Sequence, residues 1–289
     1  MTRNAYTHGH HESVLQAHRW RTAENSAAYL LPRLRPGMSL LDVGCGPGTI
    51  TADLATRLAP GGRVLGIDPA PEAVEQARSA VAAVRESLRA GVEADVQVEA
   101  DVRVGDVFTL ESTLAPGEKF DVVHAHQVLQ HLPNPVGALR AMGRLCGPGG
   151  LVAARDGDYG GFTWFPRLPE LDEWMRLYQL AHRANGGEPD AGRRLLSWAR
   201  TAGFQQVTAG ASTWCFATPE DRLFWGGGWA DRIVFSDLAR QLVDSGLATT
   251  ADLERISAGW RRWAEDDDGW LAALNGEVLC EVAQGPAGR

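Results

Sequence analysis

Short apolar runs and helical segments alternate along residues 36–159. The runs are MSLLDV, RVLGID, VQVEADVRV, KFDVVHAHQ and GLVAARDGD, and they have the continuous apolar character of strands buried on both faces of a sheet. Apolar residues recur at three and four positions in the segments between them, as in a helix. This order predicts an α/β fold with a doubly wound, mostly parallel sheet, whose ligand lies outside the carboxyl ends of the strands.

The second half of the chain has a different composition, because nine of the ten tryptophans follow residue 160. We expect residues 160–190 and 217–275 to form a helical cap over the functional edge of the sheet. Residues 191–216 and 276–289 would then complete a core that begins with residues 36–159, and residues 1–35 would form an N-terminal helical lid. Within the cap, FWGGGW (224–229) flanks three glycines with aromatic rings and predicts a mobile aromatic loop.

Composition excludes several classes of function. The formal net charge of −8 and the dispersed arginines argue against a nucleic-acid partner, and no apolar stretch reaches the roughly 20 residues of a membrane span. Four cysteines without a CxxC pair predict free thiols in a reducing cytoplasm. The histidines of the terminal HGHH, which are His8, His10 and His11, have no fixed acid or cysteine nearby, so we expect no metal. A monomer and a homodimer both remain open.

The loop after the first apolar run most sharply limits the ligand. In LLDVGCGPGTI (residues 40–50) the spacing is Asp-x-Gly-x-Gly-x-Gly, and Thr49 stands where the dinucleotide fingerprint G-x-G-x-x-G has its third glycine. Gly44, Gly46 and Gly48 allow the backbone to turn sharply and to approach a ligand. Because Asp42 would repel a pyrophosphate, we expect a ligand without phosphate at this loop.

Carboxylates also end the next two apolar runs. Asp68 ends the second, where it can accept both hydroxyl groups of a ribose. Asp106 and Val107 follow the third, where they can meet the amino group and the ring face of an adenine. Each acid alone is as consistent with a helix cap as with a ligand contact. Acids at three successive strand ends together favour a nucleoside.

These motifs resemble those of the class I S-adenosylmethionine-dependent methyltransferases over about residues 36–156. LLDVGCGPGT, GIDPA, GDVF and FDVVHAHQVLQHLPNP look like the family's first four motifs. The fourth is most similar to ubiquinone/menaquinone-type C-methyltransferases and to small-molecule methyltransferases of secondary metabolism. The resemblance implies S-adenosylmethionine as cofactor and a seven-stranded sheet whose last strand is inserted antiparallel. The cofactor-binding residues expected on this basis are Arg21, Asp42, Gly44, Cys45, Gly46, Thr49, Asp68, Pro69, Asp106, Val107, His126 and Gln127.

The charge of this cofactor agrees with the acids, because its sulfonium is a cation and its nucleoside carries no phosphate. Methyl transfer depends mainly on holding nucleophile, methyl carbon and sulfur in line, and a base is needed only where the acceptor must lose a proton early. The catalytic candidates are His126, His131 and Tyr159, which follow the fourth and fifth apolar runs. A packing role is at least as consistent with His131.

The sequence therefore predicts a methyltransferase acting on a small aromatic metabolite, either indolic, phenolic or quinone-like, with C-methylation favoured. O- or N-methylation of a secondary metabolite is the alternative. Two alternatives belong to other classes: an NAD-dependent oxidoreductase, which the glycine spacing disfavours, and a catalytically inactive methyltransferase-like binding scaffold, which the intact acids disfavour.

Overall fold

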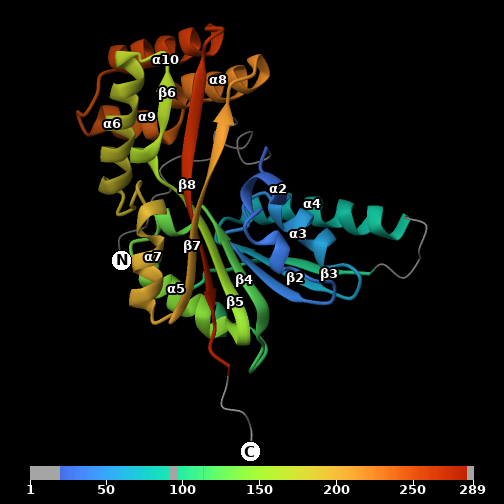
Figure 1. The fold of residues 1–289 in the computed structure, drawn as a ribbon. Helices are drawn as coiled ribbons and strands as arrows, with labels where there is room; N and C mark the ends of the chain where they lie inside the picture. The colour runs from blue at the N-terminus through green and yellow to red at the C-terminus, as the bar shows by residue number, and fades with distance from the viewer. Residues whose placement is uncertain (1–19, 91–96, 113, 285–289) are drawn as a thin grey trace, which may run out of the picture.

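A computed structural model describes residues 20–90, 97–112 and 114–284 (Figure 1). In chain order the elements are α2 (Ala23–Ser26), η1 (Leu31–Arg33), β1 (Ser39–Val43), α3 (Thr49–Leu58), β2 (Arg63–Asp68), α4 (Pro71–Ala90), β3 (Glu99–Val104), η2 (Leu110–Ser112), β4 (Phe120–His126), η3 (Leu129–His131), α5 (Pro135–Leu145), β5 (Cys146–Gly157), η4 (Tyr159–Gly161), β6 (Thr163–Phe165), α6 (Pro169–Ala184), η5 (Gly192–Arg194), α7 (Leu195–Ala202), β7 (Gln206–Phe216), α8 (Pro219–Phe235), α9 (Asp237–Asp244), α10 (Thr250–Glu265) and β8 (Trp270–Glu281). The terminal histidines His8, His10 and His11 lie outside the described residues.

The sheet confirms the predicted doubly wound, mostly parallel architecture. Strands β1 to β5 are parallel in the order β3-β2-β1-β4-β5, and β8 follows β5 in the antiparallel direction. β7 pairs with the other edge of β8, so the last strand is inserted antiparallel as the resemblance implied. The sheet has an eighth strand, β6, because Trp164 and its neighbours pair with the first residues of β8 beyond the end of β5.

Helices cover both faces of the sheet (Figure 1). The helices α2, α3 and α4 lie on one face, and α5 and α7 lie on the other. Neighbouring residues of β4 show the reason, since Val122 packs under α2 and α3 while Val123 packs against α5. Residues that point alternately to two covered faces must both be apolar, which explains the continuous apolar runs of the sequence.

The four helices α6, α8, α9 and α10 gather at one end of the sheet, around β6 and the adjoining ends of β7 and β8 (Figure 1). Their apolar faces form one core cluster that includes Trp174, Trp229, Trp260 and Trp263, none of them more than 1% exposed. The packing face expected from DLERISAGWRRW is confirmed in α10. Most cap tryptophans are therefore core residues of a helical bundle, and they do not line an open pocket.

The prediction of a mobile FWGGGW loop is wrong, because this segment lies inside α8. Thr218 caps the helix by accepting a hydrogen bond from the backbone N–H of Asp221. A Cβ at Gly226 would lie 2.9 Å from Cβ of Ala264 and 3.1 Å from the carbonyl oxygen of Trp260 in α10. Close packing of α8 on α10 thus overrides the low helix propensity of glycine.

Two neighbouring glycines of α8 give opposite expectations for alanine. Gly226→Ala should lower the free energy of unfolding by about 1–3 kcal/mol, because its Cβ overpacks the α10 contact. Gly227→Ala is the matched control, since no atom beyond its own helix backbone and chain neighbours lies within 4 Å of its Cβ position, and it should raise stability by about 0.5–1 kcal/mol. Urea unfolding measures both. Equal effects of the two substitutions would contradict the packing.

Candidate functional site

The glycine-rich loop joins the carboxyl end of β1 to the start of α3, as predicted. Gly44, Gly46 and Gly48 have φ angles of +68°, +53° and +81°, which a side chain rarely adopts. A Cβ at Gly44 would lie 2.5 Å from Cγ2 of Val128, and one at Gly48 would lie 2.6 Å from Cα of Ala77. Packing against the chain itself therefore requires two of these glycines, whatever ligand the loop holds.

Asp42 lies beneath this loop and is only 3% exposed. One carboxylate oxygen accepts the Thr51 hydroxyl of α3 at 2.6 Å, and the other lies 2.8 Å from Nδ1 of His124 on β4. The carboxylate thus ties β1, β4 and α3 together at the point where the loop begins. This geometry makes Asp42 a positioning residue of the loop, and its contact with the cofactor stays a prediction.

Asp68 ends β2 beside the loop, as the sequence predicted. One oxygen accepts the backbone N–H of Gly46 at 3.0 Å and the other accepts that of Ala70 at 2.9 Å. The side chain is half-buried and the adjacent Pro69 is exposed. The structure therefore brings Asp68 and the Gly46 backbone together at one edge of the sheet.

The other residues expected around the loop differ in their exposure and in their contacts. Asp106 is exposed after β3 and accepts the backbone N–H of Phe108 at 2.8 Å, while Val107 is buried in the core beneath α5. Thr49 is half-buried at the start of α3. The Cys45 side chain packs between α3 and α4, and its pKa is raised by burial and by the charges of Asp42 and Asp68. Cys45 is therefore a protonated thiol of the core.

The N-terminal segment reaches the end of β4 through Arg21. Its Nη2 donates to Oε1 of Gln127 at 2.5 Å, and Nε2 of Gln127 donates to Oδ1 of Asn275 on β8 at 3.3 Å. Gln127 has a φ of +52°, an unusual value for a residue with a side chain and one that often marks a functional edge. Sequence patterns gave no sign of Asn275, because it stands in a strand far along the chain.

His126 and His131 lie at this same edge. His126 is buried on β4, with its ring 5.8 Å from that of Trp214. Nε2 of His131 lies 3.1 Å from the Gln130 amide, and its ring centroid is 5.0 Å from that of His182 in α6. Burial, followed by the charges of His182 and Arg21, holds the pKa of His131 well below its usual value. His131 is therefore neutral at neutral pH.

Tyr159 follows β5 and lies in a stack of aromatic rings. Its ring centroid is 4.6 Å from that of Phe162 and 4.2 Å from that of Tyr178, with interplanar angles of 20° and 28°. Burial raises its pKa, while a hydrogen bond with the Tyr178 side chain and the charges of Arg232 and Arg21 lower it, so the hydroxyl stays protonated at neutral pH. Tyr159 can donate a hydrogen bond here, and it is unsuited to act as a base.

Asp156 is a fully buried carboxyl group at the end of β5. Its Oδ1 accepts the backbone N–H of Gln130 at 3.0 Å, which fixes the turn η3 that carries His131. Burial raises its pKa to about 7, against the lowering effect of this hydrogen bond and of Arg155. The group thus titrates near neutral pH while its backbone contact holds a histidine-bearing turn.

The raised pKa of Asp156 predicts a pH-dependent stability. Because the folded pKa of about 7 lies above the ordinary aspartate value of 3.8, the stabilising contribution of the protonated group is complete below about pH 4 and is lost as the pH rises through 7. Relative to Asp156→Asn, the wild type should therefore lose about 3 kcal/mol of unfolding free energy between pH 5 and pH 8. Urea unfolding of both proteins at the two pH values measures this difference, and parallel pH curves would contradict it.

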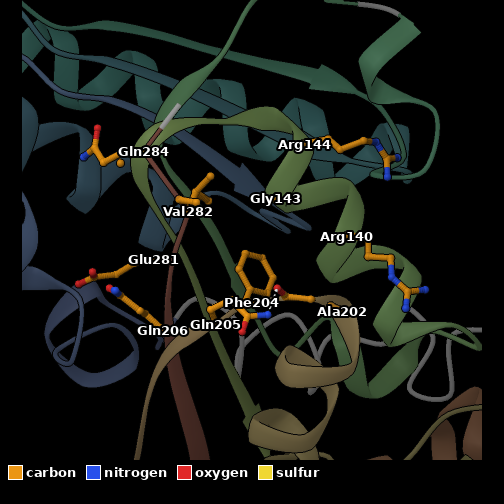
Figure 2. A pocket seen from close by; sticks show the side chains of 13 residues that line it. Arg140, Gly143, Arg144, Ala202, Phe204, Gln205, Gln206, Glu281, Val282 and Gln284 are labelled. Atoms are coloured by element: carbon orange, nitrogen blue, oxygen red, sulfur yellow. Dashed lines mark hydrogen bonds between the residues drawn. The ribbon is translucent and has the colours of Figure 1, made fainter. Parts of the chain in front are cut away.

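A separate cavity of about 590 Å³ lies at the opposite edge of the core (Figure 2). The ring of Phe204 lies inside it, while the guanidinium groups of Arg140 and Arg144 point away from that ring (Figure 2). Arg140 donates to the Thr201 carbonyl and Arg144 donates to Glu111. Because ligands of such sheets bind at the carboxyl ends of the parallel strands, this cavity is distinct from the candidate site.

No helix of the described residues is long and apolar enough to cross a membrane. The same part of the chain contains no group of three His, Cys, Asp or Glu side chains arranged to hold a metal ion. Its cysteines, which are Cys45, Cys146, Cys215 and Cys280, are free.

Comparison with known proteins agrees with the geometry. The sequence profile of the methyltransferase-domain family matches residues 15–209. An uncharacterized methyltransferase from Schizosaccharomyces pombe is 32% identical over 276 residues, which cover 95% of each chain. A ubiquinone biosynthesis O-methyltransferase from Methylocella silvestris is 37% identical over 123 residues, 43% of this chain and 41% of that one.

Solved structures share the fold. The YcgJ protein from Bacillus subtilis superposes with a TM-score of 0.51 at 17% identity, over 91% of this chain and 100% of that one. A candidate methyltransferase from Bacillus halodurans gives the same score at 18% identity, over 89% and 98% of the two chains. With a profile that matches more than half of the residues and a relative of this similarity over almost the whole length, the chain belongs to the methyltransferase-domain family and is a class I S-adenosylmethionine-dependent methyltransferase.

Proposed function

We propose that the chain methylates a small aromatic metabolite, indolic, phenolic or quinone-like, held between the carboxyl ends of β4 and β5 and the helical cap. The observation that carries this proposal is the stack of Tyr159 between Phe162 and Tyr178, with ring separations of 4.6 and 4.2 Å. Tyr159 and Tyr178 are buried in this stack while Phe162 is half-buried, so Phe162 would offer an aromatic surface to a flat acceptor where the end of β5 meets α6 of the cap. Residues 20–35 would act as a lid over this space.

The cofactor is assigned to the edge formed by β1, β2 and β3. The Gly44–Gly46 backbone would approach its methionine, and Asp68 would accept the ribose hydroxyls. The exposed Asp106 and the backbone at Val107 would meet the adenine. Arg21, Gln127 and the His126 region would hold the amino-acid end, where Arg21 can pair with a carboxylate.

Proton transfer would fall to the histidines at the end of β4. Burial keeps His131 neutral, and the same lowering of its pKa makes it a weak base, so it would accept a proton only transiently. Tyr159, protonated for the same reason, would orient the acceptor by donating a hydrogen bond. The larger contribution to the rate would come from alignment of the acceptor atom with the methyl carbon and sulfur.

Carbon is the favoured acceptor atom because the fourth motif resembles that of C-methyltransferases. Oxygen is the second candidate, and the Methylocella silvestris O-methyltransferase favours it over the part of the chain that it matches. An acidic chain with free thiols would work in a reducing cytoplasm, as a monomer or a homodimer.

The test is incubation with ¹³C-methyl-labelled S-adenosylmethionine and a panel of indoles, phenols, quinones and a small-metabolite extract. We expect a labelled aromatic product by mass spectrometry, and the carbon chemical shift of its methyl group distinguishes C-, O- and N-methylation. A labelled product without an aromatic ring would overturn the acceptor class, and a labelled O-methyl group would overturn the preference for carbon.

A further inference from the structure

Arg155 is a buried cation at the end of β5 that the site described above does not use. It is 1% exposed, although arginine is rarely buried without partners for its charge. Its Nε donates to the Ser212 hydroxyl at 3.1 Å and lies 3.3 Å from Oε1 of Glu277 on the adjacent strand β8. The Nε side of the guanidinium is thus bound by side chains of β7 and β8.

The other edge of the guanidinium lacks a partner. Both Nη1 and Nη2 of Arg155 are buried and have no hydrogen-bond partner among the described residues. The hydroxyl of Tyr29 is also buried without a partner there, and it interacts electrostatically with Arg155. A buried donor that is left unpaired costs about 1–3 kcal/mol, so several at one place indicate a site built for something else.

The position of Arg155 relates these groups to the candidate active site. Strand register places Arg155 directly beside His126 of β4 and opposite Glu277 of β8, so all three lie on one face of the sheet. The ring of Trp214 covers the guanidinium at 4.6 Å, and its Nε1 donates to the carbonyl of Asn25 in the lid. The unpaired donors therefore lie under the N-terminal segment, next to the histidine at the end of β4.

Two cations stand beside the ring of Trp214. Arg21 lies over the same Trp214 ring, at 5.6 Å, so two guanidinium groups flank this indole while Glu277 is the acid in contact with Arg155. Burial raises the pKa of Tyr29, and the charges of Glu277, Asp156 and Asp42 raise it further against the lowering effect of Arg155, so the hydroxyl stays protonated and can donate. A planar fork of two N–H groups with a nearby hydroxyl matches the two oxygens of a carboxylate.

We propose that Arg155 and Tyr29 form a subsite for a carboxylate carried by the methyl acceptor. This inference rests on the proposed function and narrows it to aromatic acids. The acceptor's carboxylate would take the two free Nη donors of Arg155 and the hydroxyl of Tyr29, and its ring would extend past His126 toward the cofactor. Both residues would act in binding and orientation, without a chemical step.

Isothermal titration of the protein saturated with S-adenosylhomocysteine tests the subsite, with benzoate as the carboxylate probe and benzamide as its neutral isostere. We expect benzoate to bind at least tenfold more tightly than benzamide. Arg155→Met should abolish this preference and leave the affinity for S-adenosylhomocysteine within twofold. Because that change leaves Glu277 buried without its cation, Tyr29→Phe serves as the milder variant and should weaken benzoate at least threefold.

Equal affinities for the two probes, or no binding of either, would overturn the carboxylate subsite. A parallel loss of S-adenosylhomocysteine affinity in Arg155→Met would also overturn it, by assigning the arginine to the cofactor's own carboxylate. The outcome is separable from that of the proposed function, because probe binding needs no turnover. A benzoate preference together with a non-aromatic labelled product would overturn the aromatic acceptor class of the proposed function and would leave the carboxylate subsite supported.

Discussion

Replacement of Asp42 by alanine is expected to lower the free energy of unfolding by about 3–5 kcal/mol, the largest stability effect we predict for this chain. The carboxylate is buried and partners both Thr51 and His124, so its removal leaves two interior polar groups without partners and opens a cavity. Urea unfolding without ligand measures the loss. S-adenosylhomocysteine should then bind more weakly, because the loop loses the anchor at its base.

Two control variants separate charge from shape at this position. Asp42→Asn keeps the volume and can still accept from His124, so it should cost about 1 kcal/mol. Thr51→Val removes one of the two contacts and should cost a similar amount. An alanine variant within 1 kcal/mol of the wild type would show that the carboxylate does not hold β1, β4 and α3 together.

Asp68→Ala is expected to weaken S-adenosylhomocysteine binding at least tenfold. A charge-assisted contact to the ribose hydroxyls contributes about 1.5–3 kcal/mol, and the same carboxylate also holds the Gly46 backbone in place. Isothermal titration gives the affinity. Asp68→Asn should fall between alanine and wild type, because an amide oxygen can still accept the Gly46 N–H while the charge is lost.

Asp106→Ala is the comparison for Asp68, since the carboxylate of this exposed acid accepts the Phe108 N–H after β3 and holds no part of the glycine-rich loop among the described residues. We expect it to weaken S-adenosylhomocysteine less than Asp68→Ala does. An unchanged affinity in Asp68→Ala would remove the ribose assignment from the end of β2, whatever the effect at Asp106.

The sheet could be predicted from the sequence because its parallel strands are buried on both faces and its loops carry glycine and proline. Runs such as RVLGID have little other way to bury their side chains. The three glycines of FWGGGW led to the wrong prediction of a loop. Glycine has a low helix propensity, but the close packing of Gly226 on α10 stabilises a helix there. The strand β6 was not predictable, since its residues pair only with a strand that begins more than a hundred positions later.

Some residues of the candidate site were likewise predictable from the sequence, and others were not. The positions of Asp68 and of the loop glycines at the carboxyl ends of β2 and β1 were predictable, because each directly follows an apolar run. The buried contacts of Asp42 with His124 and of Gln127 with Asn275 join strands far apart in sequence, so spacing could not reveal them. No sequence pattern singles out Arg155, and its position beside His126 follows from the strand register.

The long strand β8 connects the core of the sheet to the helical bundle. This strand runs for 12 residues and pairs along its length with β7, from the level of the core to the level of the helical bundle. A hinge between the two parts would have to break that ladder, so the bundle and the core should behave as one stiff body. We therefore expect acceptor and product to pass the short segment at Trp20 and Arg21, which contacts the rest of the chain through the Trp20 ring and the bond of Arg21 to Gln127.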